Sequence, residues 1–176
     1  MKNTFTNNLQ NMVEEFHVKF GHPHNDSPKA LEIGRITDRT TWTVEEFVAE
    51  LLHASAKDRD EYLTAYYKVL AGLDKAFKEQ LEKDFIQDEN ERIVAQADAL
   101  TDGIYFAMGS AVELGVDIEP VFEIVQGANM SKLFTDEDGN KYAKYREDGK
   151  VLKSPDFYQP EEFIKAEIKK QIGGEE

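Results

Sequence analysis

The chain has 176 residues, no cysteine, and a formal net charge of −14 from 21 basic and 35 acidic side chains. This length suits one domain with a hydrophobic core, and so much negative charge argues against a nucleic-acid-binding or membrane-binding protein. The lack of cysteine excludes disulfides and cysteine-bound zinc, and the absence of a signal peptide or of an apolar run of about 18–20 residues predicts a cytoplasmic protein.

The first half of the chain predicts amphipathic helices. Apolar residues within 9–20 recur at the spacing of one helical face, and Gly21 ends this helix. Residues 21–41 are rich in turn formers, so we expect a loop that contains one short helix at most. Two helices then follow, one that begins near Thr43 and another after a break near Lys57.

The middle of the chain continues the helical pattern after a charged interruption. Residues 78–92 are highly charged and predict either the end of a helix with a loop or a solvated excursion of the chain. Residues 93–114 form an apolar helix that ends at Gly115, and Asp117 begins another helix.

The C-terminal part changes character. Asp-Gly pairs at 138–139 and 148–149 are typical of hairpin turns, and a last amphipathic helix begins at Pro160. We therefore expect a single all-α domain, with core helices over about 5–128 and a basic, hairpin-like segment over about 129–176.

Carboxylates on the helix predicted over 93–114 give the sharpest chemical signal. Asp98 and Asp102 lie one turn apart, and Glu91 joins their stripe if the helix begins earlier. The rest of this helix is mostly apolar, which predicts that it is buried and that its carboxylates need compensation. Oxygen ligands alone suit Mg²⁺ or Mn²⁺. Metal binding has alternatives. Asp98 and Asp102 would accept hydrogen bonds from a Tyr or Arg of a neighbouring helix, or lie on a more solvent-exposed edge of their helix. Glu91 would belong to a charged run at the solvated surface.

A second acidic pair, Glu46 and Glu50, lies on one face of the helix that begins near Thr43. Thr43 and Glu46 also fit a capping box, in which the glutamate only satisfies backbone N–H groups. Glu46 points away from the apolar stripe, whereas Glu50 lies beside Phe47. Spacing alone therefore favours a structural role for Glu46 and leaves Glu50 open between a functional and a structural role.

The order of these parts resembles the all-α nucleoside-triphosphate pyrophosphohydrolase superfamily, which includes MazG-like proteins and phosphoribosyl-ATP pyrophosphohydrolases. Its members carry a helix with an E-E-x-x-E pattern and a second helix with E-x-x-D, both facing one magnesium site. Residues 45–54 and 97–117 resemble these two helices. Residues 128–160 resemble the most recognisable part of a phage and bacterial branch.

The resemblance implies a helical bundle that forms dimers or tetramers, in which neighbouring subunits complete the site. It implies Mg²⁺-dependent cleavage of a nucleoside triphosphate between the α and β phosphates, with a house-cleaning role in the nucleotide pool. The carboxylates it points to are Glu46, Glu50 and Asp98 for catalysis, and Glu50, Asp98 and Asp102 for the metal.

Two positions depart from the family pattern. Phe47 stands where the first motif has its second glutamate, and Ala95 stands where the second motif has its glutamate. The separation between the motifs is also longer than is usual. Glu91 lies one turn before Ala95, and we take it as the replacement ligand by the stripe geometry above.

Basic residues concentrate after the last core helix, where six of them fall between Asn129 and Lys153. A triphosphate that approaches a carboxylate-lined metal in an acidic protein needs cations and amide donors near its phosphates. The resemblance places nucleotide contacts at Asn129 and Lys132. Further candidates are Lys144, Arg146 and Lys153. The alternative is that Lys141, Lys144, Arg146 and Lys150 only solubilise a hairpin.

Two other classes of protein remain open at this point. One is a non-catalytic nucleotide-binding or scaffold protein that keeps the fold but has lost part of the metal site. Phe47 and Ala95, which replace two expected acidic ligands, keep this class open. A helical interaction module would bind no ligand at all. No short motif indicates which base or sugar is preferred, or whether the substrate is canonical or modified.

Overall fold

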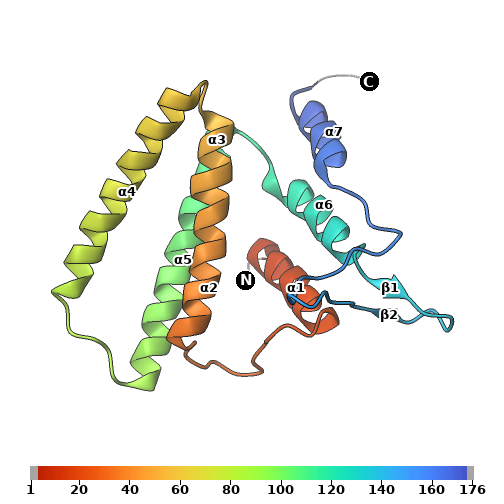
Figure 1. Cartoon of the computed structure of the whole chain (residues 1–176), viewed down its shortest axis with the longest axis horizontal. Coiled ribbons are helices and arrows are strands. Elements are labelled where there is room, and N and C mark those ends of the chain that lie inside the picture. Colours follow the sequence, from red (N-terminus) through yellow and green to blue (C-terminus); the bar gives the residue numbers. More distant parts are fainter. Residues whose placement is uncertain (1–3, 174–176) are drawn as a thin grey trace. The chain divides into compact units, whose positions relative to one another are not determined.

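The computed structural model describes residues 4–173, and helices make up nearly all of their regular structure (Figure 1). This confirms the all-α fold class. The chain divides into two compact units: one is Ser27–Leu100, and the other consists of Met1–Asp26 and Thr101–Glu176. The boundary falls within one long helix.

The unit Ser27–Leu100 begins with a helical rod in three consecutive parts. The α-helix α2 (Ile33–Val44), the π-helix η1 (Glu45–Leu51) and the α-helix α3 (Leu52–Ser55) follow one another without a gap (Figure 1). The helix α4 (Arg59–Leu81) comes after a short turn. The first part of α5 (Glu89–Leu114) completes the unit.

The start of α2 corrects the sequence prediction. The helix begins at Ile33, well before Thr43, in a stretch where we expected mostly loop. Thr37 and Thr43 donate their hydroxyl groups to the carbonyls four residues earlier, at 2.8 and 3.0 Å, so these turn-forming residues are satisfied inside a helix. Thr43 therefore cannot be an N-cap, and the capping box with Glu46 was wrong.

The turn before α4 confirms the predicted break near Lys57. Asp58 is the N-cap, and its carboxylate accepts a hydrogen bond from the backbone N–H of Glu61 at 2.8 Å. The side chain of Glu61 reaches back and accepts from the backbone N–H of Lys57 at 2.7 Å. The two reciprocal bonds resemble a capping box and satisfy donors that the first turn of a helix leaves without partners.

The segment that precedes α2 is tied to α5 by side chains that pair with its backbone. Gln96 accepts a hydrogen bond from the N–H of Leu31 at 2.9 Å and donates to the carbonyl of Leu31 at 3.0 Å. Glu89 accepts from the N–H of the buried Ala30 at 3.4 Å. These bonds position the first residues of the rod against the first half of α5.

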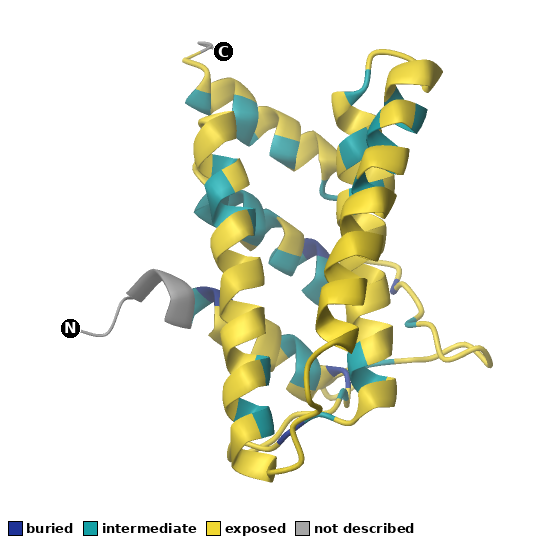
Figure 2. Ribbon diagram, turned by 90° about the vertical axis from the view of Figure 1, so that its left-hand side faces the viewer, coloured by how far each residue is buried: buried dark blue, intermediate teal, exposed yellow. Residues whose placement is uncertain are grey.

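Apolar side chains on the long helices are left in water. Among the described residues, no residue of α2, η1, α3, α4 or α5 is buried (Figure 2). On α5, Tyr105 is 76 % exposed, Phe106 72 % and Val112 78 %. The expectation that this helix is buried was therefore wrong for a single copy of the chain, whose α5 keeps its apolar face uncovered.

The other unit contains the helices α1 (Thr4–Lys19), α6 (Ile118–Met130) and α7 (Glu161–Gln171). Between α6 and α7 the chain forms a short antiparallel hairpin of β1 (Phe134–Thr135) and β2 (Lys141–Tyr142). The helix α6 packs against both α1 and α7.

The core of this unit lies along the contact between α1 and α6, from Asn8, which donates to Glu119 at 3.4 Å, to the residues that follow the two helices. Leu9, Phe20, Ala128 and Leu133 are buried there. Gln126 of α6 donates a hydrogen bond to a backbone carbonyl of α1, that of Met12, at 2.8 Å. Apolar contact and a polar bond thus fix the same pair of helices.

The two Asp-Gly pairs form turns, as the sequence predicts. Gly139 (φ 85°) lies in the turn between β1 and β2, and Gly149 (φ 80°) lies in a second turn closed by a bridge between Tyr145 and Val151. Positive φ angles favour glycine because it lacks a Cβ atom. The hairpin character of this segment is thereby confirmed.

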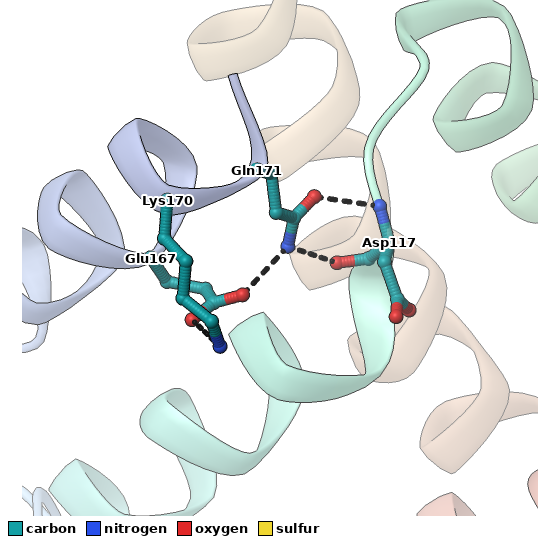
Figure 3. A network of polar contacts seen from close by, with 4 residues as sticks. All are labelled: Asp117, Glu167, Lys170 and Gln171. Carbon is teal, nitrogen blue, oxygen red and sulfur yellow. Dashed lines mark hydrogen bonds and ion pairs between the residues drawn. The ribbon is translucent and has the colours of Figure 1, made fainter. Parts of the chain in front are cut away.

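The helix α7 is joined to the start of α6 by one glutamine side chain (Figure 3). Gln171 accepts from the N–H of Asp117 at 2.9 Å and donates to its carbonyl at 3.0 Å. It also donates to Glu167 at 3.0 Å, and Lys170 donates to Glu167 at 3.2 Å. The hydrogen bonds from Gln171 and Lys170 lower the pKa of Glu167 below the ordinary value for a glutamate.

Helices that could cross a lipid bilayer are absent from the part of the chain that the structure describes.

Gly127 allows a close approach that predicts a stability effect. A Cβ atom at this position would overlap the hydroxyl oxygen of Tyr158, whereas the Cζ atom would lie 3.6 Å away, an ordinary contact. We expect Gly127→Ala to have a change in the free energy of unfolding about 1–3 kcal/mol less favourable than that of Gly72→Ala, because Tyr158 must move. Urea denaturation measures this change.

A double variant and a control test whether the overlap with Tyr158 causes the loss of stability. Adding Tyr158→Phe to Gly127→Ala removes the overlapping oxygen and should restore most of the lost stability. Gly72→Ala is the matched control, because a Cβ atom there meets nothing within 4 Å and alanine favours a helix over glycine by roughly 1 kcal/mol. If Gly127→Ala is as stable as Gly72→Ala, the close approach does not exist.

Candidate active site

The end of α6 brings together three residues that the sequence predicted for phosphate binding. Lys132 donates a hydrogen bond from Nζ to Oδ1 of Asn129 at 2.6 Å. Burial lowers the pKa of Lys132 below its usual range, and the positive charge of Lys153 lowers it further. Lys153 therefore lies near enough to repel Lys132, and neither lysine forms a salt bridge with a described residue.

Two serines place Lys153 at this position. Ser154 is buried, and its hydroxyl donates to the backbone carbonyl of Ser131 at 2.8 Å. The hydroxyl of Ser131 donates to the carbonyl of Ala128 at 2.8 Å and accepts from the N–H of Tyr158 at 3.3 Å. The chain around Lys153 is thus held against the last turn of α6.

One aromatic ring lies beneath both ammonium groups. Nζ of Lys153 is 4.2 Å and Nζ of Lys132 is 6.0 Å from the ring centroid of Phe157. Sequence reasoning missed this residue, because a lone phenylalanine in an irregular segment carries no periodic signal. Only the tertiary contact identifies it.

The two other predicted cations have partners within their own hairpin. Nζ of Lys144 lies 4.2 Å from the ring centroid of Phe134 and 5.4 Å from that of Tyr142. Arg146 forms an exposed ion pair with Asp148 at 2.8 Å. The described contacts therefore do not join Lys144 or Arg146 to the pair formed by Lys132 and Lys153.

The predicted carboxylates of α5 are exposed and unpaired. The helix begins at Glu89, so Glu91 lies in its first turn and the condition for its sharing a stripe with Asp98 and Asp102 is met. Among the described residues, these three carboxylates have no hydrogen-bond or ion-pair partner. The alternative that a Tyr or Arg compensates Asp98 and Asp102 is not seen within one copy.

The other acidic pair lies on the π-helix η1. Glu46 and Glu50 are both exposed. The sequence from Glu45 to Glu50 reads E-E-x-x-x-E, one residue longer than E-E-x-x-E. A π-helix closes its hydrogen bonds over five residues instead of four, so it accommodates the extra residue of this motif. Sequence reasoning passed over Glu45, although the adjacent glutamates were the available signal.

These carboxylates fit Mg²⁺ by donor chemistry. Unpaired carboxylate oxygens are the ligands that this cation prefers. Within residues 4–173, however, no group of three or more His, Cys, Asp or Glu side chains is close enough to hold a metal ion. The donor type is therefore present in one copy, and a complete ligand set is not.

A pocket of about 340 Å³ lies elsewhere, at the turn between α3 and α4. None of the predicted site residues lines it. Its lining residues are His53, Ala56, Lys57, Asp58, Arg59 and Tyr62.

Comparisons with known proteins agree with the helical architecture. Residues 13–129 match the family model described as phosphoribosyl-ATP pyrophosphohydrolase. That range contains all the acidic candidates and Asn129, and it ends before Lys132. No curated protein matched the chain.

A solved structure extends the similarity over nearly the whole chain. A candidate NTP pyrophosphohydrolase from Exiguobacterium sp. 255-15 is 44 % identical in sequence and superposes with a TM-score of 0.89. The match covers 94 % of this chain and 96 % of that one. The protein therefore belongs to the phosphoribosyl-ATP pyrophosphohydrolase family of the all-α NTP pyrophosphohydrolase superfamily.

Proposed function

We propose that the protein hydrolyses a nucleoside triphosphate between the α and β phosphates, giving a nucleoside monophosphate and pyrophosphate, with Mg²⁺ or Mn²⁺ as cofactor. One observation carries the proposal beyond family membership. In a chain with a formal net charge of −14, Lys132 and Lys153 lie close together with Asn129, and no carboxylate of the described residues forms an ion pair with either lysine. Such a pair of uncompensated cations attracts phosphate groups.

The phosphate contacts follow from the hydrogen bond at the end of α6. Because Oδ1 of Asn129 accepts from Lys132, the amide NH₂ group of Asn129 is available to donate to a phosphate oxygen. Lys132 and Lys153 neutralise the phosphate chain. Lys144 and Arg146 would contribute less, since Arg146 must first leave its ion pair with Asp148.

The acidic residues have separate roles in this proposal. Glu50, Asp98, Asp102 and Glu91 would hold the metal ion, and Glu45 would serve as the second acid of the first motif in place of Phe47. A bound divalent ion neutralises phosphate charge and lowers the pKa of a water molecule. Glu46 would accept the proton of the attacking water as a general base, while Glu50 and Asp98 orient the reacting groups.

We also propose that the chain assembles as a homodimer or homotetramer. Large apolar side chains exposed on the long helices support this, because a monomer rarely leaves so much apolar surface in water. An analytical ultracentrifugation run that returns the mass of one chain at micromolar concentration would contradict the proposal. The exposed apolar residues include Leu51, Leu73, Phe77, Leu100, Ile104 and Phe106.

The reaction predicts metal-dependent release of pyrophosphate from one or more members of a panel of canonical and modified nucleoside triphosphates. We expect EDTA to abolish release and Asp98→Asn to lower kcat/KM by about 100-fold or more, because the variant loses one charged oxygen at the metal. Asp60→Asn, an exposed change on α4, is the control and should keep wild-type activity. The panel also ranks substrates by base and sugar.

If no nucleoside triphosphate of the panel yields pyrophosphate, a second candidate function, non-catalytic nucleotide binding, is favoured. The departures at Phe47 and Ala95 are what support a non-catalytic nucleotide-binding protein. Such a protein would still gain thermal stability from nucleotide and Mg²⁺ without releasing pyrophosphate. A chain that shows neither effect would be a helical interaction module.

The replacement ligands can be tested without turnover. We expect Glu45→Gln and Glu91→Gln each to weaken Mn²⁺ binding by roughly ten- to 100-fold, as measured by electron paramagnetic resonance of free Mn²⁺. Glu79→Gln on α4 removes the same charge from an exposed helix and serves as the control. Unchanged Mn²⁺ affinity in either variant removes that glutamate from the ligand set.

A further inference from the structure

Two ammonium groups of like charge share the surroundings of one aromatic ring. Nζ of Lys153 lies 4.2 Å and Nζ of Lys132 lies 6.0 Å from the ring centroid of Phe157. The two lysines repel each other, as the effect of Lys153 on the pKa of Lys132 shows. Among the described residues, no carboxylate forms an ion pair with either lysine.

The ring supplies the negative potential that a carboxylate would otherwise provide. The face of an aromatic ring attracts a cation within about 6 Å of its centroid. The backbone of Phe157 is itself held, because its N–H donates to the carbonyl of Ser154 at 3.2 Å and Ser154 is buried against Ser131. The ring is thus attached to a well-anchored turn, whereas the lysine side chains are long and flexible.

A ring and a carboxylate would have different consequences for anion binding. A carboxylate would cancel one positive charge and lower the attraction for phosphate. A neutral ring restrains the ammonium groups and leaves their full charge available.

We propose that Phe157 is a positioning residue that holds the ammonium groups of Lys132 and Lys153 in place for phosphate binding. The inference rests on the proposed function only in that it takes a phosphate chain as the ligand. Phe157 need not contact the nucleotide, because its effect reaches the ligand through the two lysines.

The test uses inorganic tripolyphosphate as the probe, without metal, and isothermal calorimetry on the full chain. Phe157→Leu removes the ring and keeps an apolar side chain, and we expect it to raise the dissociation constant about three- to tenfold. Phe157→Tyr keeps the ring and should bind within about twofold of wild type.

Phe163→Leu is the matched control. Phe163 lies on α7, and its ring packs against Tyr158 at 5.0 Å between centroids. No lysine in the part of the chain that the structure describes lies over this ring. We expect this variant to bind tripolyphosphate as wild type does. An equal loss in Phe163→Leu and Phe157→Leu would mean that both changes merely loosen the C-terminal segment, and would overturn the proposal.

A double-variant cycle separates positioning from general packing. If Phe157 acts through the lysines, Phe157→Leu should cost less affinity in a Lys153→Met background than in wild type. Equal costs in the two backgrounds would overturn the proposal, as would wild-type affinity in Phe157→Leu or no binding of tripolyphosphate by the wild type.

The proposed hydrolysis and the proposed role of Phe157 are tested by different measurements. Pyrophosphate release by the wild type tests that reaction, whereas tripolyphosphate affinity tests the role of Phe157. Where the wild type is active, Phe157→Leu should raise KM about as much as it raises the dissociation constant and leave kcat within about twofold.

Discussion

Apolar side chains that one copy of the chain leaves in water are the constraint on which the rest of the structure depends. Burying a large apolar side chain is worth about 1.5–3 kcal/mol, and the helices α2, α4 and α5 bury none among the described residues. Of these helices, α5 carries Glu91, Asp98 and Asp102, and the π-helix η1, which continues α2, carries the other carboxylates proposed for the metal. A second copy that covered the apolar faces would also exclude water from those carboxylates and so increase their affinity for a cation. The proposed assembly and the proposed metal binding would in this way be coupled through α5 and η1.

Charge is arranged so that an acidic protein can attract an anion. The carboxylates lie on η1 and α5, and the uncompensated lysines follow the end of α6. Serine hydroxyl groups hold the lysine-bearing segment, and an aromatic ring restrains the lysines without neutralising them. Positive charge is therefore kept available at one place, although the chain as a whole repels phosphate.

Local signals predicted most helix ends correctly, because caps and glycine turns depend on neighbouring residues. Asp117 begins α6, and Gly139 and Gly149 lie in the expected turns. The start of α2 was missed, since threonines that favour turns can also bond back within a helix. The π-helix was missed as well, because periodicity at 100° per residue assumes an α-helix throughout. For the site, Asn129 and Lys132 could be paired from their spacing, whereas Phe157 could not be assigned a role.

The sequence by itself determined the helical class, the turns, the acidic stripes and the surplus of cations after the last core helix. Each of these depends on residue type and on spacing within one or two turns. The tertiary structure decided which cations come together, because Lys132 and Lys153 meet only when Ser154 packs against Ser131. It also decided which apolar faces remain open, since a pattern of apolar residues shows that a helix face needs a cover and does not show whether the same chain supplies it.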